Sequence, residues 1–290
     1  MTSRRIFSPA PPDRISHVTP PDGTRIAIYE WGDENLPSIV LMHGIYQSAL
    51  SWHRQFSDSD LVSRYRLVAI DLRGHGASDK PYGESFYRDG LRFAADIATV
   101  IDKLQLSRPV LCGWSFGGRV VNDYLSVHGD AGLGGIVYVG ARSVPTLPDE
   151  PPASSRFTSA SRNARSEDPA AFIRGTRQFV RLCFHRAPSR AELDALAMSS
   201  MQTPLYVRNQ TLGRKMDYSA ALSAVRVPTL IVHGRQDAII TFRGAELSAA
   251  AIGHAQLIDY DDVGHAPFAE DPERFNRDLD RFMQSLSGTP

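Results

Sequence analysis

A serine stands where a strand pattern meets a helix pattern, in the stretch VLCGWSFGGRVVNDYL at residues 110–125. The left end is apolar and strand-like, whereas apolar residues recur at helical spacing on the right. Gly113, Ser115 and Gly117 form the pattern Gly-x-Ser-x-Gly, which in a strand–turn–helix context predicts a nucleophile elbow. The glycines leave room for a strained turn that projects the hydroxyl alone. We therefore predict that Ser115 is a nucleophile.

A serine hydroxyl needs a base before it attacks near neutral pH, and the base needs an acid to orient it. His265, in VGHAPFAEDPERF, follows the last strand pattern and is the predicted base. Asp237, in VHGRQDAII, follows a buried-strand pattern and is the predicted acid. Asp261 and Asp262 are closer to His265 in sequence, but we interpret them as surface turn residues. The order Ser115, Asp237, His265 is the one expected after a nucleophile elbow.

The chain holds nine histidines, so most of them must serve the structure rather than the chemistry. His43 ends a strand pattern just before a glycine, and we expect it to brace the loop that follows. His75 lies in a glycine-framed turn, and His233 ends a strand pattern before GRQD. We interpret these three histidines as structural.

Alternating strand and helix patterns must position the predicted triad. Apolar runs at SIVLM, YRLVAI, PVLCG, GIVYV, TLIVHG and AQLIDY are typical of strands buried on both faces. Helix patterns cover SALSWHRQFSDSDLVSR and GLRFAADIATVIDKLQ. A hairpin is predicted at ISHVTPPDGTRIAIYEWG, after a loose arm at residues 1–14. This alternation predicts an α/β fold with a mostly parallel central sheet flanked by helices.

One segment interrupts the alternation. Residues 143–155 are rich in proline, and residues 156–213 carry helix patterns without a strand pattern. We predict a helical cap insertion at residues 143–213 and a core made of residues 1–142 and 214–290. Two ordinary crossover helices are the alternative, but the segment is long for a connection between strands.

The composition narrows the class of function. The 290 residues include 32 basic and 32 acidic side chains, so a clustered positive excess for nucleic acid is not expected. No apolar run reaches the length of a signal peptide or a membrane span. The two cysteines offer neither a disulfide framework nor metal-ligand spacing. We expect a cytoplasmic protein that needs no cofactor or metal and binds a small molecule, not a membrane; a homodimer is left open.

Several longer motifs carry a resemblance to a known family. VLMHGI, VAIDLRGHGASDKP, GWSFGG, VPTLIVHGRQDAII and VGHAPFAEDPERF occur in one order over residues 22–285. In these motifs the sequence resembles the α/β-hydrolase superfamily, specifically its capped bacterial esterase and haloperoxidase-like branch. The resemblance implies the α/β-hydrolase fold and an oxyanion hole formed by the backbone N–H groups of Ile45 and Phe116. It also implies that the insertion caps Ser115.

Under such a cap we expect an apolar acyl or alcohol pocket. Its candidates are aromatic residues and methionines, each of which has core packing as an alternative role: Trp52, Trp114, Phe116, Met198, Met201, Met216 and Phe268. Arg174, Arg177 and Arg181 form a basic stripe at helical spacing. Such a stripe is more often a solvated helix face than a site for a substrate carboxylate.

The triad and the resemblance together imply a serine hydrolase that cleaves a carboxylic ester or lactone of a small, mainly apolar substrate through an acyl-enzyme. Carbon–carbon bond hydrolysis, thioester hydrolysis and perhydrolysis are alternatives on the same triad. Dehalogenases and epoxide hydrolases of this fold are disfavoured, because they use aspartate where this chain has Ser115. A hydrolase-fold ligand receptor is the alternative from another class, and turnover of a generic ester separates it from an enzyme.

Overall fold

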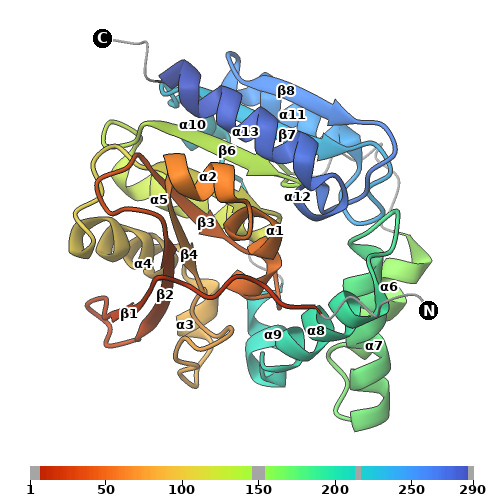
Figure 1. Cartoon of the computed structure of the whole chain (residues 1–290). Helices are drawn as coiled ribbons and strands as arrows, with labels where there is room; N and C mark the ends of the chain where they lie inside the picture. Colours follow the sequence, from red (N-terminus) through yellow and green to blue (C-terminus); the bar gives the residue numbers. More distant parts are fainter. Residues whose placement is uncertain (1–6, 146–153, 213–216, 287–290) are drawn as a thin grey trace.

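A computed structural model describes residues 7–145, 154–212 and 217–286. An eight-stranded sheet with the order β1-β2-β4-β3-β5-β6-β7-β8 runs through the centre of the molecule (Figure 1). The strands are β1 (Arg14–Val18), β2 (Ile26–Trp31), β3 (Ser38–Met42), β4 (Arg66–Ile70), β5 (Val110–Trp114), β6 (Gly135–Val139), β7 (Thr229–Gly234) and β8 (Gln256–Tyr260). From β4 to β8 every neighbouring pair is parallel, whereas β1 and β2 are antiparallel to their neighbours. The predicted α/β fold with its mostly parallel sheet is confirmed.

The central strands are apolar on both faces because both faces are covered. Along β3, Ile39 and Leu41 join one buried cluster, and Val40 and Met42 join the other. One face is covered by α4 (Gly90–Lys103), α5 (Phe116–His128), α10 (Ser219–Ser223) and α11 (Phe242–Ile252). The other face is covered by η1 (Ala49–Trp52), α1 (His53–Phe56), α2 (Ser59–Arg64), α12 (Pro267–Glu270) and α13 (Pro272–Leu286). The short α3 (Ser85–Arg88) precedes α4.

Two local predictions need correction. The helix predicted over SALSWHRQFSDSDLVSR is broken, because the Asp58 carboxylate accepts the N–H groups of Asp60 and Leu61 and so starts a new helix. The described part of the predicted loose arm is tied to the body of the protein: the Trp31 indole N–H donates to the Pro11 carbonyl at 2.8 Å. Residues 1–6 of that arm lie outside the described residues.

The described part of the segment between β6 and β7 consists of helices joined by turns and loops and contains no strand. It contains α6 (Ser155–Asn163), α7 (Pro169–Leu182), α8 (Arg190–Met201) and α9 (Leu205–Thr211), which lie together at the lower right of Figure 1. Most of the predicted proline-rich stretch, residues 146–153, lies outside the described residues. Below, "cap helices" means α6–α9. None of the helices in the described part of the chain combines the length and the apolar character needed to span a bilayer.

Candidate active site

Ser115 occupies a strained turn between β5 and α5. Its backbone angles are φ 52° and ψ −110°, a region that residues with a side chain rarely adopt. The Ser115 N–H donates to the Val139 carbonyl at 2.9 Å, which ties the turn to the end of β6. A Cβ atom at Gly117 would lie 2.4 Å from the Met42 carbonyl oxygen, so the turn fits against β3 only with glycine there. The structure thus gives Ser115 the local geometry that the sequence pattern predicts.

His265 and Asp237 meet at the same edge of the sheet. His265 Nδ1 donates to Asp237 Oδ2 at 2.7 Å, and both side chains are buried. The other carboxylate oxygen, Oδ1, accepts the N–H groups of Ile239 and Ile240 at 2.8 and 2.9 Å. Burial by itself would raise the pKa of Asp237, but the adjacent His265 and the hydrogen bonds hold it well below its usual range. A stable carboxylate therefore orients the His265 ring.

The alternative acids lie elsewhere. Asp261 is exposed and pairs with Arg235 at 3.3 Å, and Asp262 is exposed and pairs with Arg186 at 2.9 Å. These positions agree with the interpretation of both as surface turn residues.

His233 is a second imidazole on the Asp237 carboxylate. His233 Nε2 lies 3.1 Å from Asp237 Oδ2 and 2.9 Å from the Ile240 carbonyl. The structural role inferred for His233 is thus specific: its N–H supports the acid that orients His265. The spacing of four residues between His233 and Asp237 is visible in the sequence, but it does not reveal this contact.

Glu270 is a site-supporting residue that sequence reasoning missed. Its carboxylate accepts the N–H groups of Gly264 at 2.7 Å and of Arg186 at 2.8 Å. Gly264 precedes His265, and Arg186 follows α7, so one carboxylate joins the histidine loop to the cap helices. Burial raises the pKa of Glu270 to about 7, against the opposing effect of these hydrogen bonds.

Two neutral histidines brace the loops beside Ile45. His43 Nδ1 donates to the Gly44 carbonyl at 2.7 Å, and its Nε2 accepts the Leu72 N–H at 3.0 Å. His75 Nδ1 donates to the Arg73 carbonyl at 2.9 Å, and its Nε2 accepts the Tyr46 N–H at 3.1 Å. Burial lowers the pKa of His43 to about 4, and burial together with the nearby His43 lowers that of His75 to about 3.

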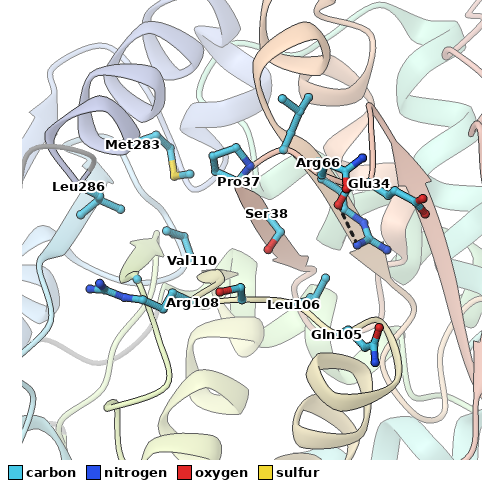
Figure 2. A pocket seen from close by; sticks show the side chains of 14 residues that line it. Glu34, Pro37, Ser38, Arg66, Gln105, Leu106, Arg108, Val110, Met283 and Leu286 are labelled. Carbon is cyan, nitrogen blue, oxygen red and sulfur yellow. Dashed lines mark hydrogen bonds between the residues drawn. The ribbon is translucent and has the colours of Figure 1, made fainter.

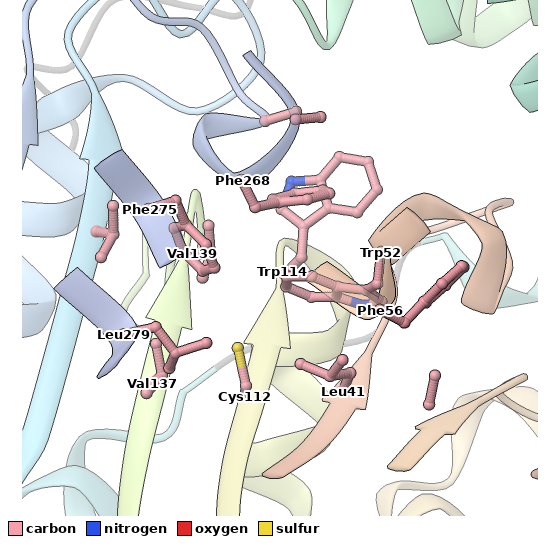
Figure 3. Close-up of a cluster of buried hydrophobic side chains, with 14 of the residues drawn as sticks. Leu41, Trp52, Phe56, Cys112, Trp114, Val137, Val139, Phe268, Phe275 and Leu279 are labelled. Atoms are coloured by element: carbon pink, nitrogen blue, oxygen red, sulfur yellow. The ribbon is translucent and has the colours of Figure 1, made fainter. Parts of the chain in front are cut away.

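Three of the aromatic pocket candidates, Trp52, Trp114 and Phe268, pack against one another. Figure 3 shows Trp52, Trp114 and Phe268 within one buried cluster. Trp52 is 0% exposed and its ring lies 4.3 Å from that of Phe268, so it packs within the core; its predicted place in a substrate pocket stays a prediction. Trp114 is tied to the site, because its indole N–H donates to the His265 carbonyl at 2.8 Å.

A small cavity of about 10 Å³ lies between Trp114, Phe268 and the cap helices. Its remaining walls come from both parts of the chain: Gln47, Ser51, Val180, Cys183, Phe184, Leu196, Ala266 and Ala269. Among the predicted pocket residues, Trp114 and Phe268 are therefore the ones that line this space.

Other pocket candidates are placed elsewhere. Met198 is 64% exposed and lines an outer groove with Pro9–Pro12, not the small cavity beside Trp114 and Phe268; its predicted place in the substrate pocket stays a prediction. The Phe116 side chain packs on Phe93 in the cluster on the opposite face of the sheet. Phe116 is the first residue of α5, as expected for the residue after the elbow serine. Met201 is partly buried against the first cluster, and Met216 lies outside the described residues.

The basic stripe on α7 is solvated. Arg174, Arg177 and Arg181 are all exposed. Arg177 pairs with Asp194 of α8, and the Arg181 guanidinium donates to the Phe184 carbonyl. Within the stripe, Arg177 therefore links α7 to α8 on the outer surface of the cap helices.

A larger cavity, of about 480 Å³, lies at the other edge of the sheet. Ser38, Arg66 and Val110, the first residues of β3, β4 and β5, line it (Figure 2). The Arg66 guanidinium is already paired with Glu30 at 2.6 Å. Ser115, Asp237 and His265 all follow strand carboxyl ends, so this cavity has no part in their chemistry. Among the described residues, no group of three or more His, Cys, Asp or Glu side chains is placed to hold a metal ion.

Comparison with known proteins identifies the family. Residues 37–272 match the model described as alpha/beta hydrolase fold, and the chain belongs to this family of hydrolases. Its structure resembles that of a candidate aryl esterase from Burkholderia cenocepacia, with a TM-score of 0.90 and 36% identity over 95% of this chain and 100% of that chain. An esterase from Rhodococcus sp. ECU1013 has a TM-score of 0.86 and 33% identity over 94% of this chain and 99% of that chain. A non-heme haloperoxidase from Rhodococcus erythropolis is 30% identical, covering 92% of this chain and 99% of its own length.

Proposed function

We propose that this hydrolase is a serine esterase that cleaves a small, mainly apolar carboxylic ester or lactone through an acyl-enzyme. The observation that carries the proposal is the buried His265–Asp237 hydrogen bond of 2.7 Å, at the sheet edge where Ser115 holds its strained turn. Because His265 Nδ1 donates to the carboxylate, its Nε2 is left as the acceptor for a serine proton. The esterases among the similar structures support the same chemistry.

In the proposed mechanism Ser115 attacks the ester carbonyl while His265 takes the hydroxyl proton. Asp237 stabilises the imidazolium that forms. The N–H groups of Ile45 and Phe116 bind the oxyanion of the tetrahedral intermediate. His265 then protonates the leaving alcohol, and water attacks the acyl-enzyme by the reverse sequence of proton transfers.

Perhydrolysis is a second candidate activity, favoured by the similarity to a non-heme haloperoxidase. It uses the same acyl-enzyme, with hydrogen peroxide in place of water as the attacking nucleophile, and releases a peracid. Measuring peracid formation from a short carboxylic acid or ester with peroxide tests it directly.

The proposed nucleophile is tested by covalent labelling. A fluorophosphonate should label Ser115, and Ser115→Ala should lose both labelling and hydrolysis of p-nitrophenyl acetate, because among the described serines Ser115 is the one in a nucleophile-elbow turn. Ser126→Ala, on the exposed side of α5, is the matched control and should keep both. Labelling of another residue, or ester hydrolysis by Ser115→Ala at the wild-type rate, would refute the assignment. Labelling without turnover of esters, lactones or thioesters would point to a receptor.

A further inference from the structure

Arg208 is a fully buried arginine at the centre of the cap helices. It belongs to α9 and its side chain is 0% exposed. Its guanidinium donates to the carbonyls of Thr203 at 3.0 Å, Ala164 at 3.1 Å and Ser200 at 2.5 Å. A further donor reaches Thr176 Oγ1 at 3.3 Å. One side chain therefore joins the ends of α6 and α8 to α7 and α9.

The positive charge of Arg208 is stabilised by backbone carbonyl dipoles and by aromatic rings. Among the ion pairs of the described residues, none joins Arg208 to a carboxylate. Burial lowers the pKa of Arg208 to about 10, so the group is a cation at neutral pH. Its Cζ atom lies 4.6 Å from the centre of the Tyr46 ring and 4.7 Å from that of Phe172. A buried cation without a carboxylate partner is expensive for a fold to keep, which suggests a role beyond packing.

Among the described core residues, Tyr46 is the one whose ring Arg208 covers, and it directly follows Ile45. Its φ angle is +64°, which is unfavourable for an aromatic residue. The Tyr46 hydroxyl donates to the Arg208 carbonyl at 3.2 Å, and the Tyr46 N–H donates to His75 at 3.1 Å. The conformation of the peptide after Ile45 is thus held from two sides: by a histidine of the core and by an arginine of the cap helices.

We propose that Arg208 is a positioning residue for the oxyanion hole. By clamping the Tyr46 ring and hydroxyl, it keeps the strained Tyr46 backbone in place and so directs the Ile45 N–H toward the developing oxyanion. Packing of the cap helices and completion of the oxyanion hole are then one coupled event. This inference rests on the proposed function, because it needs Ile45 to be an oxyanion donor.

The alternative is that Arg208 only stabilises the cap helices, and Glu192 provides the matched control. Glu192 of α8 is also buried and also anchors the cap helices to the core, through Arg54 at 2.6 Å and His53 at 2.9 Å. In the described structure both of these partners are in α1, not at Tyr46. Glu192→Gln should lower the melting temperature but leave kcat and the Ser115 labelling rate within about twofold of wild type.

The test compares Arg208→Met and Arg208→Lys with that control. Arg208→Met should lower both kcat for p-nitrophenyl acetate and the fluorophosphonate labelling rate by about 10–100-fold, below the 10²–10³ for loss of a whole oxyanion donor. KM should change much less, because the substrate's ground state gains little from the hole. Arg208→Lys should recover part of the loss, since it keeps a cation beside Tyr46. Adding Tyr46→Leu to Arg208→Met should cost no more than the larger single effect, because both act through one residue.

Three outcomes would overturn the inference: a lowered melting temperature with unchanged kcat in Arg208→Met, additive losses in the double variant, or Arg208→Lys no better than Arg208→Met. If Arg208→Met does not fold, Tyr46→Leu alone decides, and wild-type kcat and labelling in that variant would reject the clamp. Failure of wild-type Ser115 to label would instead reject the proposed function, so the two failures are distinguishable.

Discussion

Asp237 is the residue on which the proposed proton chemistry depends. One of its oxygens serves two histidines, at 2.7 and 3.1 Å, and the other accepts two backbone N–H groups. These donors hold the pKa of the Asp237 carboxyl well below its usual range, so the group is a carboxylate at neutral pH. The His233 N–H only restrains the Asp237 carboxylate, whereas the His265 N–H belongs to the proposed base itself.

This difference predicts unequal effects of two substitutions. Asp237→Asn should lower kcat/KM by about 10⁴, as amidation of a triad acid favours the wrong imidazole tautomer. His233→Gln should cost only about tenfold, because Asp237 keeps its other three donors. His254→Gln is the control, since His254 is exposed and lies away from the site. Steady-state hydrolysis of p-nitrophenyl acetate measures all three, and a larger loss in His233→Gln than in Asp237→Asn would contradict these roles.

At the scale of elements, the loops after β3 and β4 are built around buried neutral imidazoles. His43 and His75 each donate through Nδ1 and accept through Nε2, so each ring holds two backbone groups and must stay neutral. A protonated ring would lose its acceptor and carry a buried charge. The loop that holds Ile45 is therefore stable only where both rings are neutral.

This arrangement predicts a loss of stability in acid. The pKa of each imidazole is lower in the folded protein, about 4 and about 3, than the usual 6.5, so their contribution is complete above pH 6.5 and is lost as pH falls toward 4. Each unit of pKa difference corresponds to about 1.4 kcal/mol. His75→Gln should therefore be less stable at pH 7 but lose less free energy of unfolding between pH 7 and 4.5. Urea denaturation measures this. His17→Gln, at an exposed position, should lose as much free energy of unfolding between pH 7 and 4.5 as the wild type does. An equal loss in His75→Gln would argue against the buried neutral imidazole.

At the scale of the whole molecule, the cap helices meet the core at Trp114, the residue before the proposed nucleophile. Leu196 and Met198 belong to the same helix, α8, but they lie in different environments. Leu196 is 4% exposed and lines the small cavity against Trp114, whereas Met198 is 64% exposed in the outer groove. The inner side of α8 is therefore the one expected to select substrates.

Truncating Leu196 should change both substrate preference and stability, whereas truncating Met198 should change neither. Leu196→Ala should enlarge the cavity and raise the ratio of kcat/KM for p-nitrophenyl hexanoate to that for the acetate. It should also cost about 2–5 kcal/mol of stability, because the cavity is only partly refilled. Met198→Ala should change neither the ratio nor the melting temperature. A ratio that shifts in Met198→Ala but stays fixed in Leu196→Ala would place the substrate on the other side of α8.

The sequence by itself determined the features that depend on neighbouring residues. Short apolar runs predicted the buried strands, and the glycines around Ser115 predicted a turn that only glycine permits. His265 and Asp237 could be proposed because both follow strand patterns, and the carboxyl ends of parallel strands share an edge. The role of these residues as a triad stays a prediction until the substitutions are made.

Only the tertiary structure decided which distant side chains meet. Asp237 and His265 are 28 positions apart, and Tyr46 and Arg208 are 162 positions apart. Helical spacing predicts that Leu196 and Met198, two residues apart, lie on different sides of α8, but it does not say which side faces the core. Nor could it assign Arg208, since a buried arginine and an exposed one look alike in sequence. The physical reason is that local patterns set backbone conformation within a few residues, whereas a side chain's partner depends on how the sheet and the cap helices bring separate segments together.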